Sequence, residues 1–338
     1  MENKRILILG SDESFSLEKM YQRAFSELRN KVNLFHIYNI RKNFISRFIW
    51  KYFRFISFFL IRKKIIEYLK NNNKKYDLII VFKGIYINKQ FLADIKKISN
   101  GVKIIDIFPD NPFDVDYFKD ISNKNVLKSI PFFDHVFIYS KIILKKLKKK
   151  YPKNNFSYLP FGYDNVVHKK LKKISNYKPN FDLSFIGTAD DERYKIIKEL
   201  NEFKIILAGD GWNKYNLSNN ITYIKKVNFK NFSKLLNISK ISLNILRKQN
   251  EKSHNMKTFE IPSMGGLMIT KRTSEQNFFF PENKASLMYK NIRELKFKIN
   301  KLNTNLRKYH QIKKKSYIIV KKHSYIERAK FLLKVIYD

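Results

Sequence analysis

A lysine and a glutamate on one short predicted helix are the residues best suited to chemistry. Lys257 and Glu260 lie three positions apart, so a helix brings them onto one face. The glutamate could accept two hydrogen bonds from a ribose diol, and the lysine could neutralise a phosphate. An ordinary surface Lys–Glu pair has the same spacing, so both interpretations stay open.

The residues around this helix extend the pattern. Arg247 ends a predicted strand and offers a second cation for phosphates. His254, in the loop before the helix, is a candidate phosphate contact, and its alternative is an exposed loop histidine. Gly265 and Gly266 end the helix before the next strand, and we include them among the candidate binding residues.

A glycine between a strand and a helix is a second candidate phosphate-binding feature. The apolar run 182–186 ends at Gly187, and the next predicted helix carries Arg193 in its first turn. A glycine lets a phosphate approach the backbone, and a helix N-terminus supplies aligned N–H groups. The alternative is a plain turn in which Asp190 or Asp191 caps the helix.

Two aspartates follow predicted strands in the first half of the chain. Asp110 comes after the strand 103–108, and Asp12 follows the strand 4–9. Parallel α/β sheets bind ligands at the carboxyl ends of their strands, so either aspartate is a candidate general base for an acceptor hydroxyl. For Asp110 the alternative is a turn formed with Asn111-Pro112.

Short apolar runs alternate with helical patterns, which predicts parallel sheets built from βαβ units. A polar stretch near 160–180 separates two such series, so we predict two doubly wound α/β domains. In the first, strands are predicted at 4–9, 32–37, 77–82, 103–108 and 134–139, with helices near 16–29, 43–70, 88–98, 113–129 and 140–150. In the second, strands are predicted at 181–186, 203–208, 221–224, 241–246 and 267–270, with helices at 191–201, 229–238, 255–264 and within 291–337.

The composition excludes several classes of protein. The chain has 338 residues, and 44% of them are hydrophobic, which is too many for a disordered polycation. It has no cysteine and no closely spaced histidine pair, so we expect no metal site and no cofactor. The dinucleotide and P-loop glycine motifs are both missing from the sequence.

The net charge of +40 suggests a polyanionic partner. Only 13 of the 69 basic residues are arginine, whereas lysine, asparagine, isoleucine, phenylalanine and tyrosine are all abundant. An A/T-rich coding sequence produces this composition, so we attribute most of the charge to coding bias and expect no nucleic-acid partner.

The first apolar run is too short for a signal peptide, so we expect a cytoplasmic protein. A predicted helix over 44–66 carries Arg47, Lys51 and Arg54 as one stripe among many aromatic residues. Such a helix could lie on an anionic membrane surface, which would place the protein peripherally on the inner face of the membrane. It could equally be a core helix with one solvated stripe.

Several motifs resemble those of the glycosyltransferase family of spore maturation protein CgeB, and they occur in the same order along the chain. The resemblance covers most of the chain and is most specific around Glu260. The matching segments are Phe82-Lys83-Gly84, Asp110-Asn111-Pro112-Phe113, 159–164, 185–193, 208–212, 243–266 and His323-Ser324-Tyr325 with Arg328.

The resemblance implies a GT-B fold, in which two Rossmann-like domains face a cleft and the second binds a nucleotide-sugar donor. It implies an acceptor-side domain over 1–168, a donor domain over 169–320 and a closing helix over 321–338. Glu260 would hold the donor ribose, and Lys257 would bind phosphate. Gly187 and Arg193 match the phosphate loop, and Gly209 and Gly211 match the loop near the base.

The function expected from the resemblance is a metal-independent hexosyltransferase. It would use a nucleoside diphosphate sugar and an acceptor hydroxyl on a surface glycan, a lipid-linked glycan or a protein. Retaining relatives often carry a second glutamate eight positions before the ribose one. Here that position is Lys252, next to Glu251, which leaves the stereochemistry open. The rival functions are a nucleotide-sugar epimerase, an inactive homologue and a basic nucleic-acid-binding protein.

Overall fold

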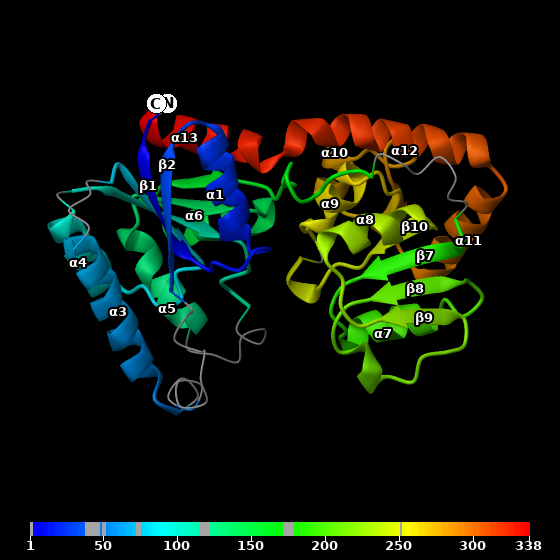
Figure 1. Ribbon diagram of the computed structural model, residues 1–338, viewed down its shortest axis with the longest axis horizontal. Coiled ribbons are helices and arrows are strands. Elements are labelled where there is room, and N and C mark those ends of the chain that lie inside the picture. The colour runs from blue at the N-terminus through cyan, green and yellow to red at the C-terminus, as the bar shows by residue number, and fades with distance from the viewer. Residues whose placement is uncertain are drawn as a thin grey trace. The chain divides into compact units, whose positions relative to one another are not determined.

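The computed structural model describes residues 3–37, 48, 52–71, 76–99, 101–114, 122–171, 179–250 and 252–338. The chain forms two compact units, one of residues 1–160 with 325–338 and one of residues 161–324 (Figure 1). The predicted boundaries after 168 and after 320 lie a few residues from these divisions. The difference arises because Tyr163 pairs with Ser324, which ties the segment after Pro160 to the end of the second unit.

The first unit is a parallel sheet of six described strands in the order β2-β1-β3-β4-β5-β6. Its strands are β1 (Arg5–Gly10), β2 (Lys31–His36), β3 (Leu78–Phe82), β4 (Lys103–Phe108), β5 (His135–Ile138) and β6 (Phe156–Tyr158). Its helices are α1 (Leu17–Glu27), α3 (Arg54–Asn71), α4 (Lys89–Ile98), α5 (Ser122–Ser129), α6 (Lys141–Lys150) and α13 (Tyr325–Tyr337). The order changes direction between β1 and β3, so their carboxyl ends border the crevice where such sheets bind ligands.

The second unit has a parallel sheet of six described strands in the order β12-β11-β10-β7-β8-β9. Its strands are β7 (Phe181–Ile186), β8 (Ile205–Ala208), β9 (Ile221–Ile224), β10 (Ser239–Asn244), β11 (Met268–Lys271) and β12 (Leu287–Tyr289). Its helices are α7 (Asp191–Lys198), α8 (Phe229–Asn237), α9 (Lys257–Ser263), α10 (Ser274–Phe279), α11 (Ile292–Asn303) and α12 (Leu306–Val320). This is the strand order of a Rossmann sheet, with its switch point between β7 and β10.

Apolar strands and capped helices account for most of these elements. The central strands β1, β3 and β4 are buried along almost their whole length, as expected for a sheet covered on both faces. Many helices begin at a residue whose side chain accepts a backbone N–H from the first turn. These caps are Ser16, Asn88, Asp190, Asn228, Thr273, Asn291 and Asn305.

The α/β fold with two doubly wound units agrees with the sequence prediction, but some elements differ. The segment 271–291 forms α10 and β12, neither of which was predicted, because six and three residues are too short to show a period. Several residues that the sequence analysis named lie outside the described residues: Arg47, Lys51, Glu251 and, in the polar stretch near 160–180, residues 172–178. In the part of the chain that the structure describes, no helix is long and apolar enough to cross a membrane.

Candidate active site

Two glycine-containing loops pack against each other at the carboxyl ends of β7 and β8, beside the switch point of the second sheet. Gly209, after β8, has φ +131, and a Cβ there would lie 2.4 Å from the carbonyl oxygen of Gly187, after β7. Only glycine permits this approach. The same carbonyl accepts a hydrogen bond from Trp212 Nε1 at 2.8 Å, and Ala189 N donates to Asp210 O at 2.8 Å. Gly211 lies against Ala189, so the two predicted loops form one surface.

Two arginines border this surface and share one aspartate. Arg193 donates through Nη1 to Thr188 O at 2.7 Å and lies beside the ring of Phe185. Asp190 Oδ2 is 3.5 Å from Arg193 Nε and 3.7 Å from Arg247 Nε. Asp190 Oδ1 also caps α7 by accepting from Arg193 N. The structure thus brings Gly187, Arg193 and Arg247 together and fixes the loop that precedes α7.

Glu260 is buried on α9 between a lysine and a histidine. Lys257 Nζ donates to Glu260 Oε2 at 2.8 Å, and His168 Nε2 lies 3.6 Å from Glu260 Oε1. Burial raises the pKa of Glu260, but the charge of Lys257, the electrostatic interaction with His168 and the hydrogen bond from Lys257 together outweigh burial. The pKa of Glu260 therefore lies below its usual range. Glu260 is therefore an ionised carboxylate at neutral pH.

The proton of His168 is placed by a backbone contact. The N–H of Asp164 donates to His168 Nδ1 at 2.9 Å, so Nδ1 acts as an acceptor there. In the neutral ring the proton then sits on Nε2, the atom that faces Glu260. Sequence reasoning missed His168, because 92 residues separate it from Glu260 and only the fold brings the two side chains together.

Paired amides hold the start of α9 against the end of β10. Asn244 and Asn255 exchange two side-chain hydrogen bonds of 3.1 and 2.8 Å, and Asn255 Oδ1 also accepts from Thr258 N. At the other end of α9, Gly266 N donates to Ile261 O at 2.9 Å, so Gly265 and Gly266 terminate the helix as predicted. The helix that carries Lys257 and Glu260 is thereby anchored at the carboxyl edge of the sheet.

His254 is placed differently from the expectation of a phosphate contact or an exposed loop residue. It is fully buried, and its ring packs against Phe161, Phe259 and Phe279. Phe161 N donates to His254 Nε2 at 3.2 Å, and Nδ1 lies 2.7 Å from Glu275 Oε2. Both ring nitrogens are thus occupied by protein groups, which corrects the expectation: His254 holds the interior of the second unit together.

The first unit gathers charged groups at the carboxyl ends of β1, β3 and β4. Asp110 Oδ2 lies 3.0 Å from Lys83 Nζ, and the Asp110 side chain is only 13% exposed. Asp12 is more open, with 47% of its side chain exposed, and pairs with Lys19 at 2.5 Å. The two aspartates therefore have different environments.

A buried glutamate, Glu18, belongs to the same edge and was not predicted. Its Oε1 accepts from Ser11 N at 3.1 Å, and a Cβ on Gly10 would collide with its side chain. Burial raises the pKa of Glu18, and backbone hydrogen bonds at Glu18 and Ser11, followed by the charge of Lys83, oppose that rise in part. The sequence shows Glu18 only as an acidic residue in the first turn of a helix. That position by itself indicates a helix-stabilising role and does not indicate a functional site.

Asp106 in β4 is a second buried acid of the first unit. It is fully buried, and both its carboxyl oxygens lack a hydrogen-bond partner among the described residues. Burial raises the pKa of Asp106 well above its usual range, which favours the neutral acid over the carboxylate. Among the residues that the structure describes, no group of three or more His, Cys, Asp or Glu side chains is placed to hold a metal ion.

The fold is similar over nearly its whole length to solved glycosyltransferase structures. Sucrose-phosphate synthase from Thermosynechococcus elongatus is 10% identical, with 99% of this chain and 98% of that chain covered and a TM-score of 0.71. Anabaena HepE in complex with UDP-glucose is 12% identical, with 99% of both chains covered and a TM-score of 0.70. A glycosyltransferase from Rickettsia africae is 13% identical, with 99% and 98% covered and a TM-score of 0.66.

The chain has the GT-B fold. This confirms the fold class that the motifs implied. In sequence, residues 193–334 match a family described as glycosyl transferase-like. A search of curated proteins finds no match. In this GT-B chain the matched segment begins at Arg193 and includes Arg247, Lys257 and Glu260, so it contains the cations and the acid described above.

Proposed function

We propose that this chain is a glycosyltransferase that moves a sugar from a nucleoside diphosphate sugar to an acceptor hydroxyl. The observation that carries the proposal is the ionised, buried Glu260 on α9 inside the glycosyl transferase-like segment of a GT-B chain. Because HepE structures hold UDP-glucose and UDP, uridine diphosphate sugars are the donors to test first.

On the donor side, Glu260 accepts hydrogen bonds from the ribose, and nearby cations bind the diphosphate. Lys257 has 29% of its side chain exposed, and Arg247 has 33%, so both can turn toward a ligand. Arg193 is held more tightly and keeps the loop of Gly187 in shape. These cations stabilise the charge that develops on the leaving diphosphate, which is the basis for proposing a metal-independent reaction.

On the acceptor side, Asp110 is the proposed general base. The acceptor oxygen forms a bond to the anomeric carbon, which loses its bond to the diphosphate oxygen, and the hydroxyl proton passes to a carboxylate. Lys83 Nζ, 3.0 Å from Asp110 Oδ2, pairs with that carboxylate and orients it. Asp12 is the second candidate. Its greater exposure favours Asp110, because a general base works best where water is excluded.

The finer assignments are proposals as well. We propose a hexosyltransferase of the CgeB-like group, with a surface glycan, a lipid-linked glycan or a protein as acceptor. A cytoplasmic enzyme that docks on the inner face of the membrane is supported by four large aromatic side chains, three just before α3 and one in its second turn. Phe48, Tyr52, Phe53 and Phe59 are between 44% and 64% exposed. Co-sedimentation with anionic vesicles tests this, and no binding at low salt rejects it.

A thermal-shift titration tests the donor site. A nucleotide at about 100 times its dissociation constant stabilises a site by about 2.7 kcal/mol, which is a readily measured rise in melting temperature. We expect one UDP sugar to stabilise the wild type and Glu67→Gln, an exposed control on α3, but not Glu260→Gln. If no nucleotide stabilises the wild type, the proposal is wrong.

Mass spectrometry of the products separates transfer from the rival reaction on the same fold. A glycosylated acceptor together with free nucleoside diphosphate supports transfer, whereas an epimerised donor contradicts it. We expect Asp110→Asn to lower kcat about a hundredfold or more with little change in donor affinity, because general base catalysis contributes about 100- to 10,000-fold.

A further inference from the structure

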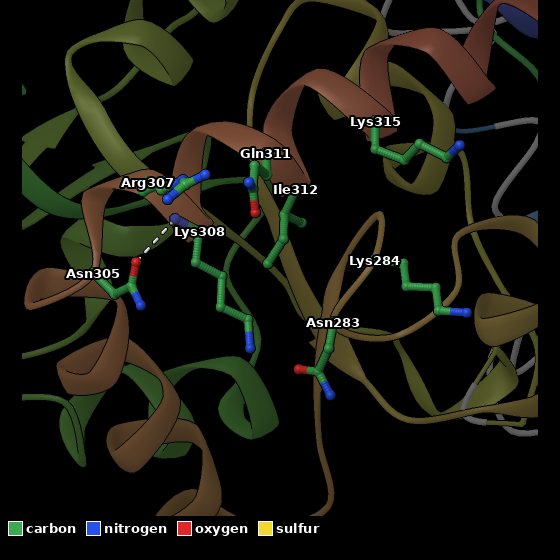
Figure 2. Close-up of a pocket in the computed structure, with 8 residues that line it drawn as sticks. All are labelled: Asn283, Lys284, Asn305, Arg307, Lys308, Gln311, Ile312 and Lys315. Carbon is green, nitrogen blue, oxygen red and sulfur yellow. Dashed lines mark hydrogen bonds between the residues drawn. The ribbon is translucent and has the colours of Figure 1, made fainter.

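A hollow of about 640 Å³ in the second unit combines several cations with amide groups (Figure 2). α12 forms one wall, from its N-cap Asn305 as far as Lys315, and the loop at Asn283 and Lys284 forms the facing wall. Lys308, Ile312 and Lys315 are spaced i, i+4 and i+7, so they line one face of the helix. None of the residues lining this hollow is acidic, and none belongs to the donor site described above.

The four cations of the hollow have no acidic partner in the part of the chain that the structure describes. Lys284, Arg307, Lys308 and Lys315 form no ion pair with any acidic side chain that the structure describes. This differs from the adjacent part of the same unit, where Arg272 pairs with two glutamates. Like charges that line one hollow repel each other, and a bound anion relieves that repulsion.

The donors of the hollow suit phosphate groups. Arg307 can bind two oxygens at once, the lysines act as point charges, and the side chains of Asn283 and Gln311 add neutral donors. The hollow also lies at the first turns of α12, a fifteen-residue helix whose N-terminus carries partial positive charge. Four charges in one hollow match a ligand with two or more phosphates better than a single carboxylate.

We propose that this α12 hollow is a binding site for a ligand that carries two or more phosphate groups, separate from the donor site. The proposal rests on the charge and shape of the hollow and does not depend on the transferase function. The phosphates could belong to a soluble oligophosphate or to the headgroups of an anionic lipid surface, and the experiment has one arm for each.

The test compares two triple variants that remove the same charge. The α12 variant carries Arg307→Gln, Lys308→Gln and Lys315→Gln. The control carries Lys145→Gln, Lys146→Gln and Lys149→Gln on exposed positions of α6 in the other unit. Circular dichroism first confirms that both variants are folded, which is expected because glutamine and lysine have similar helix propensities.

Isothermal titration calorimetry with tripolyphosphate at about 0.1 M salt, where long-range attraction is screened, forms the first arm. Sedimentation with phosphatidylglycerol vesicles forms the second. In the arm that holds the true ligand, we expect the α12 variant to weaken binding about tenfold or more and the control less than about threefold. Selective loss in the first arm assigns a soluble ligand, and selective loss in the second assigns lipid headgroups.

Two outcomes overturn the proposal. One is the lack of wild-type binding in both arms. The other is equal weakening by the two triple variants, which shows that the total charge of +40 attracts anions without a site. Neither outcome affects the donor titration, so a failure here is distinguishable from a failure of the proposed transferase function.

Discussion

His168 contacts Glu260 through one ring nitrogen and its own loop through the other, so the two roles can be separated by substitution. His168→Asn keeps an acceptor near the Asp164 N–H but has no atom at the position of Nε2. His168→Gln places a donor near Glu260 but loses the acceptor at Nδ1. If His168 orients Glu260, the Asn variant raises the KM for the donor about three- to tenfold at a nearly unchanged Tm, as expected for the loss of one polar contact of about 1 kcal/mol.

The Gln variant is expected to show the reverse pattern, a lower Tm with a nearly normal donor KM. Steady-state kinetics and thermal melts measure both quantities on the same samples. An Asn variant with a normal KM would mean that His168 only supports its loop.

Gly209 offers a second test at the scale of one residue. Both Gly209 and Gly101 have positive φ, but a Cβ on Gly209 would lie 2.4 Å from a carbonyl oxygen, whereas one on Gly101 meets nothing within 4 Å. Gly101→Ala is therefore expected to lose only about 1–2 kcal/mol, the cost of the left-handed conformation. Gly209→Ala should lose more and should also abolish nucleotide stabilisation, because the loop of Gly187 has to move.

Urea unfolding of both glycine variants, with and without nucleotide, checks this prediction. Equal losses of stability in the two variants would show that the contact between the loops contributes nothing.

At the scale of elements, an ion-pair network joins the end of β11 to α11. Arg272 pairs with Glu282 at 2.7 Å and with Glu294 at 2.5 Å, and Lys298 lies 3.2 Å from Glu294. The hydrogen bond from Arg272 is the main cause that lowers the pKa of Glu294 to about 2, from the usual 4.5. Between about pH 2 and pH 4.5, Glu294 therefore stays ionised in the folded state but is protonated in the unfolded state.

This shift predicts how stability depends on pH. The pKa of Glu294 is lowered by folding, so its contribution is fully present above pH 4.5 and is lost as pH falls toward 2. Glu294→Gln should cost about 1 kcal/mol at pH 6, since the pair is partly exposed, and the difference from wild type should shrink through that window. Urea midpoints from pH 6 to 2.5 measure it. A difference that stays constant with pH would contradict the prediction.

Patterns in the sequence are sufficient to predict the bounds of elements whose apolar runs are long and unbroken. β3 and β4 were predicted within one residue because each is a buried run bounded by polar residues. β12 and α10 were not predicted from the sequence. With three and six residues respectively, they are too short to show a periodic pattern, and their stability depends on neighbouring elements. The site shows the same limit: the spacing of Lys257 and Glu260 is local, whereas Glu18 and His168 acquire their environments from contacts that only folding creates.

At the scale of the whole molecule, the net charge of +40 is unevenly compensated. Acids of the second unit are used in specific pairs with Arg272, Lys298, Lys240 and Lys257. The cations of the α12 hollow have no such pairs among the described residues, which is why we place a ligand there rather than treating all surface lysines alike. The composition alone could not distinguish these two groups of cations.

The division of the chain makes a last prediction, because the end of the sequence belongs to the first unit. α13 packs on α1, where Tyr325 contacts Tyr21, and Leu332 and Leu333 are buried. Removal of residues 325–338 should unfold the first unit and leave the second folded. Each buried leucine contributes about 2–5 kcal/mol, so the combined loss approaches the about 5–15 kcal/mol that stabilises a domain. Hydrogen exchange followed by mass spectrometry resolves the two units separately, and Phe331→Ala, at a side chain that is 43% exposed, is the control. Protection of β1 and β3 that survives the truncation would show that the first unit folds without its last helix.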